Sequence, residues 1–136
     1  MTGRAFADTN VLIYAALLDD PDKAAQAKST LLVTHVLSVQ VLNEFVSASI
    51  GKFGRTWPEV EADLALIDQA GFEIQPVTRE VHDAAVELAR RHHLHIYDAC
   101  IVAAALEAGC DTLWSEDLQA GRQFGGLTVK NPFEVE

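Results

Sequence analysis

The sequence has few cysteines, few basic residues and no long hydrophobic run. Cys100 and Cys110 are too few for a disulfide scaffold, and their spacing is not that of a C-x-x-C pair. No apolar stretch approaches the ~20 residues that a membrane-spanning helix requires. The stretch before the first apolar run, residues 1–4, is too short and polar for a signal peptide. These absences predict a cytoplasmic, reduced protein without a membrane segment.

Positive charge is scarce. The chain carries 10 Lys and Arg residues against 20 Asp and Glu residues, a formal net charge of −10. Such a chain repels nucleic-acid phosphates over most of its surface. A nucleic-acid enzyme with this balance needs a local basic rim or bound cations, and an acidic chain also suits a basic protein partner.

The rest of the composition is that of a globular protein. Of the 136 residues, 49% are hydrophobic and 22% are charged, which predicts one domain over residues 1–136 with a sizeable core. Short apolar strands alternate with helical patterns, and this predicts an α/β fold with a mainly parallel sheet flanked by helices. Five strands are expected, at residues 5–8, 34–38, 72–76, 112–115 and 127–130. Helices are expected after Asp8, over 23–32 and 39–52, after the 56–59 capping box, after Thr78 and over 97–108.

Two of these helices have distinct patterns. Residues 97–108 are apolar nearly all round, which is typical of a buried helix. The helix after Thr78 is amphipathic, yet a simple alternation of strand and helix gives it no place.

Four acids are predicted to meet at one edge of the sheet. Asp8 follows the first strand, Asp117 follows the fourth, Glu44 lies in the helix after the second strand, and Asp98 opens the buried helix. Ligands of open parallel sheets bind beyond the carboxyl ends of the strands. The four side chains are therefore expected to face a common ligand.

Each acid also has a structural interpretation. Asp8 or Asn10 suits a helix N-cap, as does Asp98, while Asp117 suits an Asx-turn and Glu44 a solvated helix face. The convergence of all four at one edge favours a functional role. Close carboxylates repel one another unless a cation neutralises them, and oxygen ligands favour Mg²⁺ or Mn²⁺.

Five segments, taken in order, resemble a known family. They are Asp8-Thr9-Asn10-Val11-Leu12, Asn43-Glu44-Phe45, Tyr97-Asp98-Ala99, Ser115-Glu116-Asp117 and Asn131-Pro132-Phe133. This ordered set, which covers nearly the whole chain, resembles PIN-domain proteins of the VapC toxin type. The resemblance implies a PIN-like three-layer fold with a five-stranded, mainly parallel sheet. It also implies a Mg²⁺- or Mn²⁺-dependent endoribonuclease that pairs with an antitoxin protein and forms a homodimer.

The resemblance assigns roles residue by residue. The catalytic and metal-binding acids of the family correspond to Asp8, Glu44, Asp98 and Asp117. The family's hydroxyl positions near the metal correspond to Thr9 and Ser115. Asn10 and Glu116 are further candidates for polar groups that support the site. Many members carry a further acid two residues after the last Asp; here Gln119 stands there, and Glu116 is the nearest replacement. Candidate RNA phosphate contacts, each weighed against a plain role as a solvated helix charge, are Lys52, Arg55, Arg79, Arg90 and Arg91.

Alternative functions have weaker support in the sequence. A zinc site at His92, His93 and His95 lacks partner cysteines. Lys130-Asn131-Pro132-Phe133 echoes the lysine–proline turn of phosphorelay receivers, but the second and third strands end without a phosphoacceptor Asp. The remaining alternatives to a nuclease are a receiver-like protein and a PIN fold kept only for binding. The complete set of four acids argues against the binding-only PIN fold.

Overall fold

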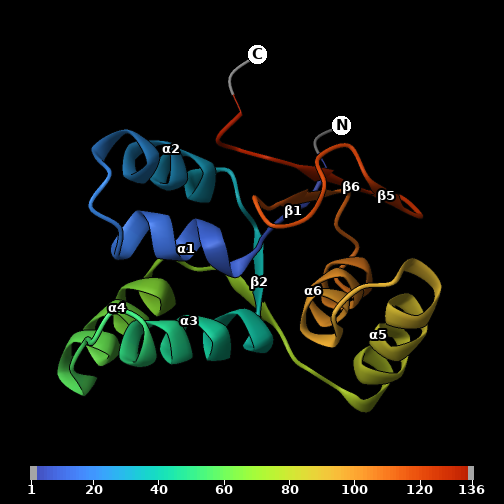
Figure 1. Ribbon diagram of the computed structural model, residues 1–136, viewed down its shortest axis with the longest axis horizontal. Helices are drawn as coiled ribbons and strands as arrows, with labels where there is room; N and C mark the ends of the chain where they lie inside the picture. Colours follow the sequence, from blue (N-terminus) through green and yellow to red (C-terminus); the bar gives the residue numbers. More distant parts are fainter. Residues whose placement is uncertain (1–2, 135–136) are drawn as a thin grey trace.

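The computed structural model describes residues 3–134 (Figure 1). Its centre is a six-stranded sheet with the strand order β3-β2-β1-β4-β6-β5, parallel except for the pairing of β5 with β6. The strands are β1 (Ala5–Ala7), β2 (Val36–Ser38), β3 (Glu73–Gln75), β4 (Thr112–Trp114), β5 (Gln123–Phe124) and β6 (Leu127–Lys130). The α/β class and the mainly parallel sheet are as the sequence predicts.

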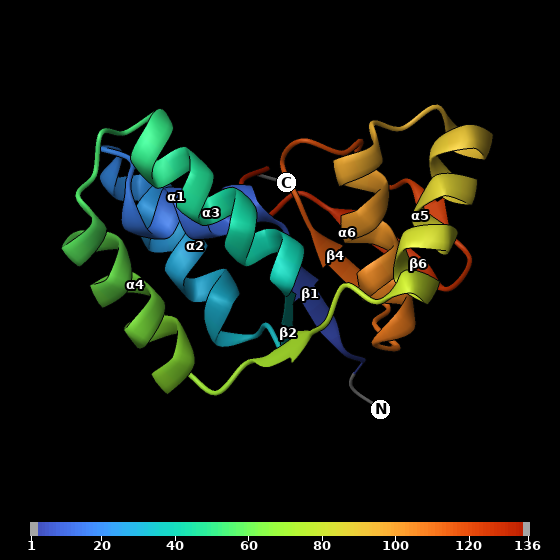
Figure 2. The same cartoon turned by 90° about the horizontal axis from the view of Figure 1, so that it is seen from below.

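The helices form two groups around the central strands. In both views, α1 to α4 lie together on one side of β1 and β2, and α5 and α6 lie on the other (Figures 1 and 2). The helices are α1 (Thr9–Ala16), α2 (Pro21–Leu32), α3 (Val39–Gly51), α4 (Trp57–Gln69), α5 (Arg79–His92) and α6 (Ile96–Glu107). Among residues 3–134, no helix is long and apolar enough to span a membrane.

Local capping signals set the predicted helix starts. Thr56 and Glu59 form both hydrogen bonds of a capping box at the start of α4. The Thr78 hydroxyl accepts a hydrogen bond from the backbone N–H of Val81 and caps α5. The helix over residues 97–108 begins one residue earlier than expected, and its side chains from Ala99 to Ala105 are all buried. This burial confirms the prediction of a core helix.

The sheet has one strand more than the sequence predicts. Gln123 and Phe124 pair antiparallel with Thr128 and Leu127, which makes β5 the edge of the sheet. A strand of two residues is too short to show periodicity, so no pattern in the sequence predicts it. The pairing depends on a two-residue turn in which Gly125 has a φ of +59°.

The structure also places α5, the helix that simple alternation could not accommodate. It packs against α6 as a helical hairpin, joined by the short loop 93–95. His93 ends α5 with a left-handed φ of 56°. The chain therefore leaves α5 beside the start of α6, where Asp98 lies.

Candidate active site

The carboxyl ends of β1 and β4 bring the first and last motifs together. Ala7 is in register with Trp114, and the backbone hydrogen bonds between the two strands continue one residue beyond β1. The backbone N–H of Asp8 donates to the Trp114 carbonyl at 2.9 Å, while the Ser115 hydroxyl donates to Asp8 Oδ2 at 2.8 Å. Sheet register thus joins two residues that are far apart in the sequence.

The two carboxylate oxygens of Asp8 have different roles: one caps a helix, and the other belongs to the candidate site. Its Oδ1 accepts a hydrogen bond of 2.7 Å from the N–H of Thr9, so the side chain caps α1. Its Oδ2 faces Ser115 and Asn10. The residue is 3% exposed, and this burial raises the pKa of Asp8 to about 7, with the charges of Asp117 and Glu44 adding and hydrogen bonds from Ser115 and Thr9 opposing. Capping and site roles therefore coexist at this position.

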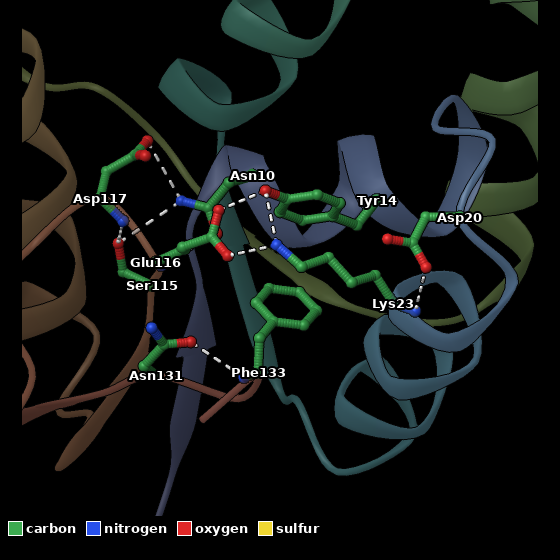
Figure 3. Close-up of polar contacts among 9 residues, drawn as sticks. All are labelled: Asn10, Tyr14, Asp20, Lys23, Ser115, Glu116, Asp117, Asn131 and Phe133. Carbon is green, nitrogen blue, oxygen red and sulfur yellow. Dashed lines mark hydrogen bonds and ion pairs between the residues drawn. The ribbon is translucent and has the colours of Figure 1, made fainter. Parts of the chain in front are cut away.

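Asn10 lies between the carboxylates of Asp8 and Asp117, which follow β1 and β4. Figure 3 shows its amide facing Ser115 and Asp117. Its Oδ1 accepts a hydrogen bond of 3.2 Å from the backbone N–H of Glu116, which fixes the orientation of the amide. Its Nδ2 then lies 3.3 Å from Asp8 Oδ2, 3.3 Å from Asp117 Oδ2 and 3.4 Å from Ser115 Oγ. The amide donates towards both acids and links them across the edge of the sheet.

Ser115 builds the turn that carries Asp117. Its hydroxyl oxygen accepts hydrogen bonds from the N–H groups of Asp117 and Leu118, both at 3.2 Å. The sequence suggested an Asx-turn by Asp117 itself, but the side-chain turn is made two residues earlier. The exposed carboxylate of Asp117 is consequently left facing Asn10 and solvent.

Glu44 is held at both oxygens. The Thr9 hydroxyl donates to Oε1 at 3.1 Å, and Gln40 Nε2 donates to Oε2 at 2.8 Å. Glu44 is half-buried, so a freely solvated helix face is the wrong interpretation. The sequence reasoning did not find Gln40, although its position four residues before Glu44 on α3 is the spacing at which helical side chains meet.

Asp98 does not cap α6. The N-cap is His95, whose Nδ1 accepts a hydrogen bond of 3.1 Å from the N–H of Tyr97. Asp98 lies in the first helical turn and is half-buried. Burial raises the pKa of Asp98, the charge of Asp117 raises it further, and His95 opposes both. Asp98 and Asp117 therefore interact electrostatically at the same edge.

The donor set fits a hard divalent cation. Within residues 3–134, no three His, Cys, Asp or Glu side chains are gathered into a metal-binding group. The histidines of the zinc alternative, His92, His93 and His95, therefore form no such group either. The four acids nevertheless supply only oxygen donors, which Mg²⁺ and Mn²⁺ prefer. In the described part of the chain, the hydrogen-bond donors to buried Asp8 are all neutral. Asp8 and Asp117 are the residues best placed to share a cation.

Glu116 does not join the other acids. Its carboxylate accepts hydrogen bonds from the Tyr14 hydroxyl and from Lys23, whose Nζ is 2.9 Å from Oε2. Only its backbone N–H contacts Asn10. The expectation that Glu116 replaces the acid missing at Gln119 is therefore wrong for this structure. Tyr14 and Lys23 were not found from the sequence; Tyr14 follows Asn10 by four residues on α1, and Lys23 has no local signal.

The predicted phosphate contacts lie in different settings. Arg55 is paired with Asp63, Arg79 with Asp83 and Arg90 with Glu87, at 2.9, 2.9 and 2.6 Å. Arg79 opens α5, while Arg90 and Arg91 lie at the end that leads to Asp98, roughly 16 Å further along the helix. Among the described residues, neither Lys52 nor Arg91 forms an ion pair.

An apolar hollow of the structure lies away from the acids. It has a volume of about 600 Å³ and is lined by residues of α1, α2, α3 and α4. Its apolar lining includes Leu12, Leu31, Leu66 and Phe72. None of the four acids lines it, so the candidate site is an open edge of the sheet and not this hollow.

Solved structures share this fold at low sequence identity. The VapC20 toxin of Mycobacterium tuberculosis, a sarcin–ricin loop cleaving toxin, is 20% identical with a TM-score of 0.68, covering 83% of this chain and 91% of its own. A toxin–antitoxin complex from Klebsiella pneumoniae is 23% identical with a TM-score of 0.70, covering 96% and 99%. The DNA-bound VapBC complex of Salmonella typhimurium is 16% identical with a TM-score of 0.65, covering 96% and 99%.

Sequence comparison identifies the family. A search of curated proteins finds no match. The family model described as the PIN domain matches residues 5–122, a stretch that includes β1, all six helices and the segment carrying Asp117. Because this match spans most of the sequence and agrees with the fold, the chain belongs to the PIN-domain family.

Proposed function

We propose that this PIN-domain protein is a metal-dependent endoribonuclease and the toxin of a toxin–antitoxin pair. The observation that carries the proposal is the junction of Asp8 and Asp117 through Asn10, with Glu44 and Asp98 at the same edge. Support also comes from relatives of the same fold, one a toxin that cleaves the sarcin–ricin loop and others toxin–antitoxin complexes. The substrate class is RNA, and the bond hydrolysed is a phosphodiester.

The acids and their neighbours would share the work. Asp8 and Asp117 would hold Mg²⁺ or Mn²⁺ directly, with Asp98 beside them. The bound cation would supply a water of lowered pKa and would stabilise charge on the phosphoryl oxygens. Glu44, fixed by Thr9 and Gln40, would orient the attacking water. The neutral hydrogen bonds of Ser115 and Asn10 keep Asp8 in place for this role.

A cleavage assay tests the proposal directly. Purified protein should cleave RNA in Mn²⁺ or Mg²⁺ and lose this activity in chelator, and sequencing RNA ends after brief expression in cells should reveal defined cleavage sites. A folded protein that binds RNA or a partner without cleaving would instead support a binding-only PIN domain. Stable binding of beryllofluoride would support the receiver-like alternative.

We expect the antitoxin and the metal to oppose each other. An Arg or Lys of the antitoxin brought to the acidic edge can supply the charge that a cation supplies, and Arg suits carboxylates best. Titrating the cognate antitoxin against the toxin, with and without Mn²⁺ at constant ionic strength, measures the coupling. Saturating Mn²⁺ should weaken antitoxin binding. Equal affinities in both buffers would show that the antitoxin does not occupy the metal site.

We expect Tyr97 to contact an unpaired base of the RNA. Its side chain is 58% exposed beside Asp98, and the His95 ring packs edge-on against it with centroids 5.0 Å apart. Stacking on an aromatic side chain contributes about 1–3 kcal/mol per base. Tyr97→Ala should therefore weaken binding of a short single-stranded RNA about fivefold to 150-fold.

Fluorescence anisotropy in chelator measures this binding without cleavage. The cap of α6 is retained in Tyr97→Ala because His95 accepts its hydrogen bond from the backbone of residue 97. Trp57→Ala is the matched control, since Trp57 has a similar exposure of 60% and lies at the start of α4. Helix α4 follows the C-terminal end of α3, and Glu44 is nearer to the other end of that helix. Equal losses in the two variants would contradict a base contact at Tyr97.

A further inference from the structure

A cluster of four side chains lies beside Asn10, on the side away from Asp117, and joins four parts of the chain (Figure 3). We call Tyr14, Lys23, Glu116 and Phe133 the Lys23 cluster. Lys23 Nζ is 2.9 Å from Glu116 Oε2 and 3.3 Å from the Tyr14 hydroxyl, which itself donates to Glu116 Oε1. The ammonium group also lies 4.5 Å from the Tyr14 ring centroid and 5.4 Å from that of Phe133. The cluster therefore ties α1, α2, the loop after β4 and the segment after β6.

The segment after β6 is shaped to complete this cluster. Asn131 Oδ1 accepts a hydrogen bond of 2.9 Å from the N–H of Phe133, a local turn typical of Asn. The turn brings the Phe133 ring to Tyr14, with ring centroids 4.6 Å apart. The Asn131-Pro132-Phe133 motif of the sequence thus acts at the Lys23 cluster and not among the acids.

Glu116 connects the cluster to the candidate site. Its carboxylate is held by Tyr14 and Lys23, and its backbone N–H donates to Asn10 Oδ1. The other end of that amide faces Asp8 and Asp117. Among residues 3–134, Asn10 is the side chain that forms a hydrogen bond with the Asp117 carboxylate, so the position of this acid depends on the loop that Glu116 anchors.

We propose that Lys23 and Tyr14 are positioning residues, which hold Glu116 so that Asn10 and the loop after β4 present Asp8 and Asp117 to one divalent cation. This inference rests on the proposed function. Neither residue touches the reacting atoms in this arrangement. Their effect passes through the Glu116 carboxylate to its backbone N–H and then to the Asn10 amide.

The sign of the effect separates positioning from simple electrostatics. Lys23 places a positive charge near an acidic site. If charge alone mattered, the site should bind Mn²⁺ more tightly once Lys23 is removed. Positioning predicts the opposite, because Asp117 becomes less well ordered and ligand geometry is lost. The Lys23–Glu116 pair is partly exposed, at 38% and 27%, and such pairs add little to folding stability. A loss of Mn²⁺ affinity at nearly unchanged melting temperature is therefore the expected signature.

Calorimetric titration of Mn²⁺ into four variants measures this sign. Lys23→Ala should weaken Mn²⁺ binding about fivefold or more, and Tyr14→Phe should weaken it without any change of charge. Lys23→Arg should restore part of the loss because it keeps the ion pair. Lys28→Ala is the matched control, since it removes the same charge from the same helix at a residue that lines the apolar hollow.

A second measurement needs no metal. In chelator, the side-chain amide signals of Asn10 in NMR spectra should shift and broaden in Lys23→Ala and Tyr14→Phe and stay unchanged in Lys28→Ala. Mn²⁺ binding by Lys23→Ala as tight as that of wild type, or tighter, would overturn the proposal. If wild type binds no Mn²⁺, the metal site of the proposed function is wrong, and unchanged Asn10 signals in both cluster variants would then overturn the positioning role as well.

Discussion

Asp8→Asn is expected to lower RNA cleavage about a hundredfold or more while the protein stays folded. The new amide oxygen can still accept from the N–H of Thr9, and Asn is a favoured N-cap, so α1 keeps its start. The NH₂ group of the new side chain takes the place of Oδ2, which accepts a hydrogen bond of 3.3 Å from Asn10 Nδ2 in the wild type. Two donors then face each other. The variant loses the buried negative charge and one cation ligand. A hundredfold loss corresponds to about 2.7 kcal/mol of transition-state stabilisation.

The control for this variant is Asp111→Asn. Asp111 is exposed and precedes β4, at the opposite end of the strand from Ser115, so the same chemical change is made away from the site. Its cleavage rate should stay close to that of wild type. Circular dichroism and thermal melts establish that both variants are folded. Near-normal cleavage by folded Asp8→Asn, free of contaminating nuclease, would remove Asp8 from the catalytic site.

The meeting of the acids was predictable because it follows from strand order. Parallel strands share a carboxyl edge, so Asp8 after β1 and Asp117 after β4 come together once the strands are recognised. The capping box of Thr56 and Glu59 was also predictable, because its partners are three residues apart. Such features depend on local patterns or on topology alone.

The details within the site depend on contacts that no local pattern reveals. Asn10 lies between two acids because sheet register brings Glu116 to its amide oxygen. The carboxylate of Glu116 turns away because Tyr14 of α1 and Lys23 of α2 bind it. The cap of α6 was misplaced for a different reason: Asp is favoured at N-caps and His is not, so Asp98 was considered where His95 performs the role.

Metal-free protein is expected to lose stability as the pH rises. The pKa of Asp8 is raised to about 7 in the folded protein from an ordinary value of 3.8, mainly by burial. Between these values the folded state binds more protons than the unfolded state, so the free energy of unfolding falls with increasing pH. This loss of stability is absent below the pKa of Asp8 in the unfolded chain and is complete above its pKa in the folded protein. Mn²⁺ should offset it, adding about 2.7 kcal/mol at a hundred times its dissociation constant.

Asp98→Asn should raise the melting temperature of the metal-free protein and reduce its response to Mn²⁺. Burial and the charge of Asp117 raise the pKa of Asp98, so the ionised form is disfavoured and a neutral amide removes that penalty. The change also removes a negative charge from the first turn of α6, which costs about 0.3–1 kcal/mol at a helix start. We expect the relief to exceed this cost at alkaline pH, where the carboxyl of Asp98 must carry its charge in the wild type. The His95 cap is unaffected, because it contacts Tyr97.

Thermal melts of wild type and Asp98→Asn, in chelator and in Mn²⁺ at matched ionic strength, separate the two roles of this residue. In chelator the variant should melt above wild type at alkaline pH. The difference should shrink as the pH falls, because protonation then neutralises Asp98 in the wild type too. The Mn²⁺-induced rise should be smaller in the variant, since one ligand is gone. If the variant melts below wild type in chelator and still responds fully to Mn²⁺, Asp98 stabilises the start of α6 and does not belong to the metal site.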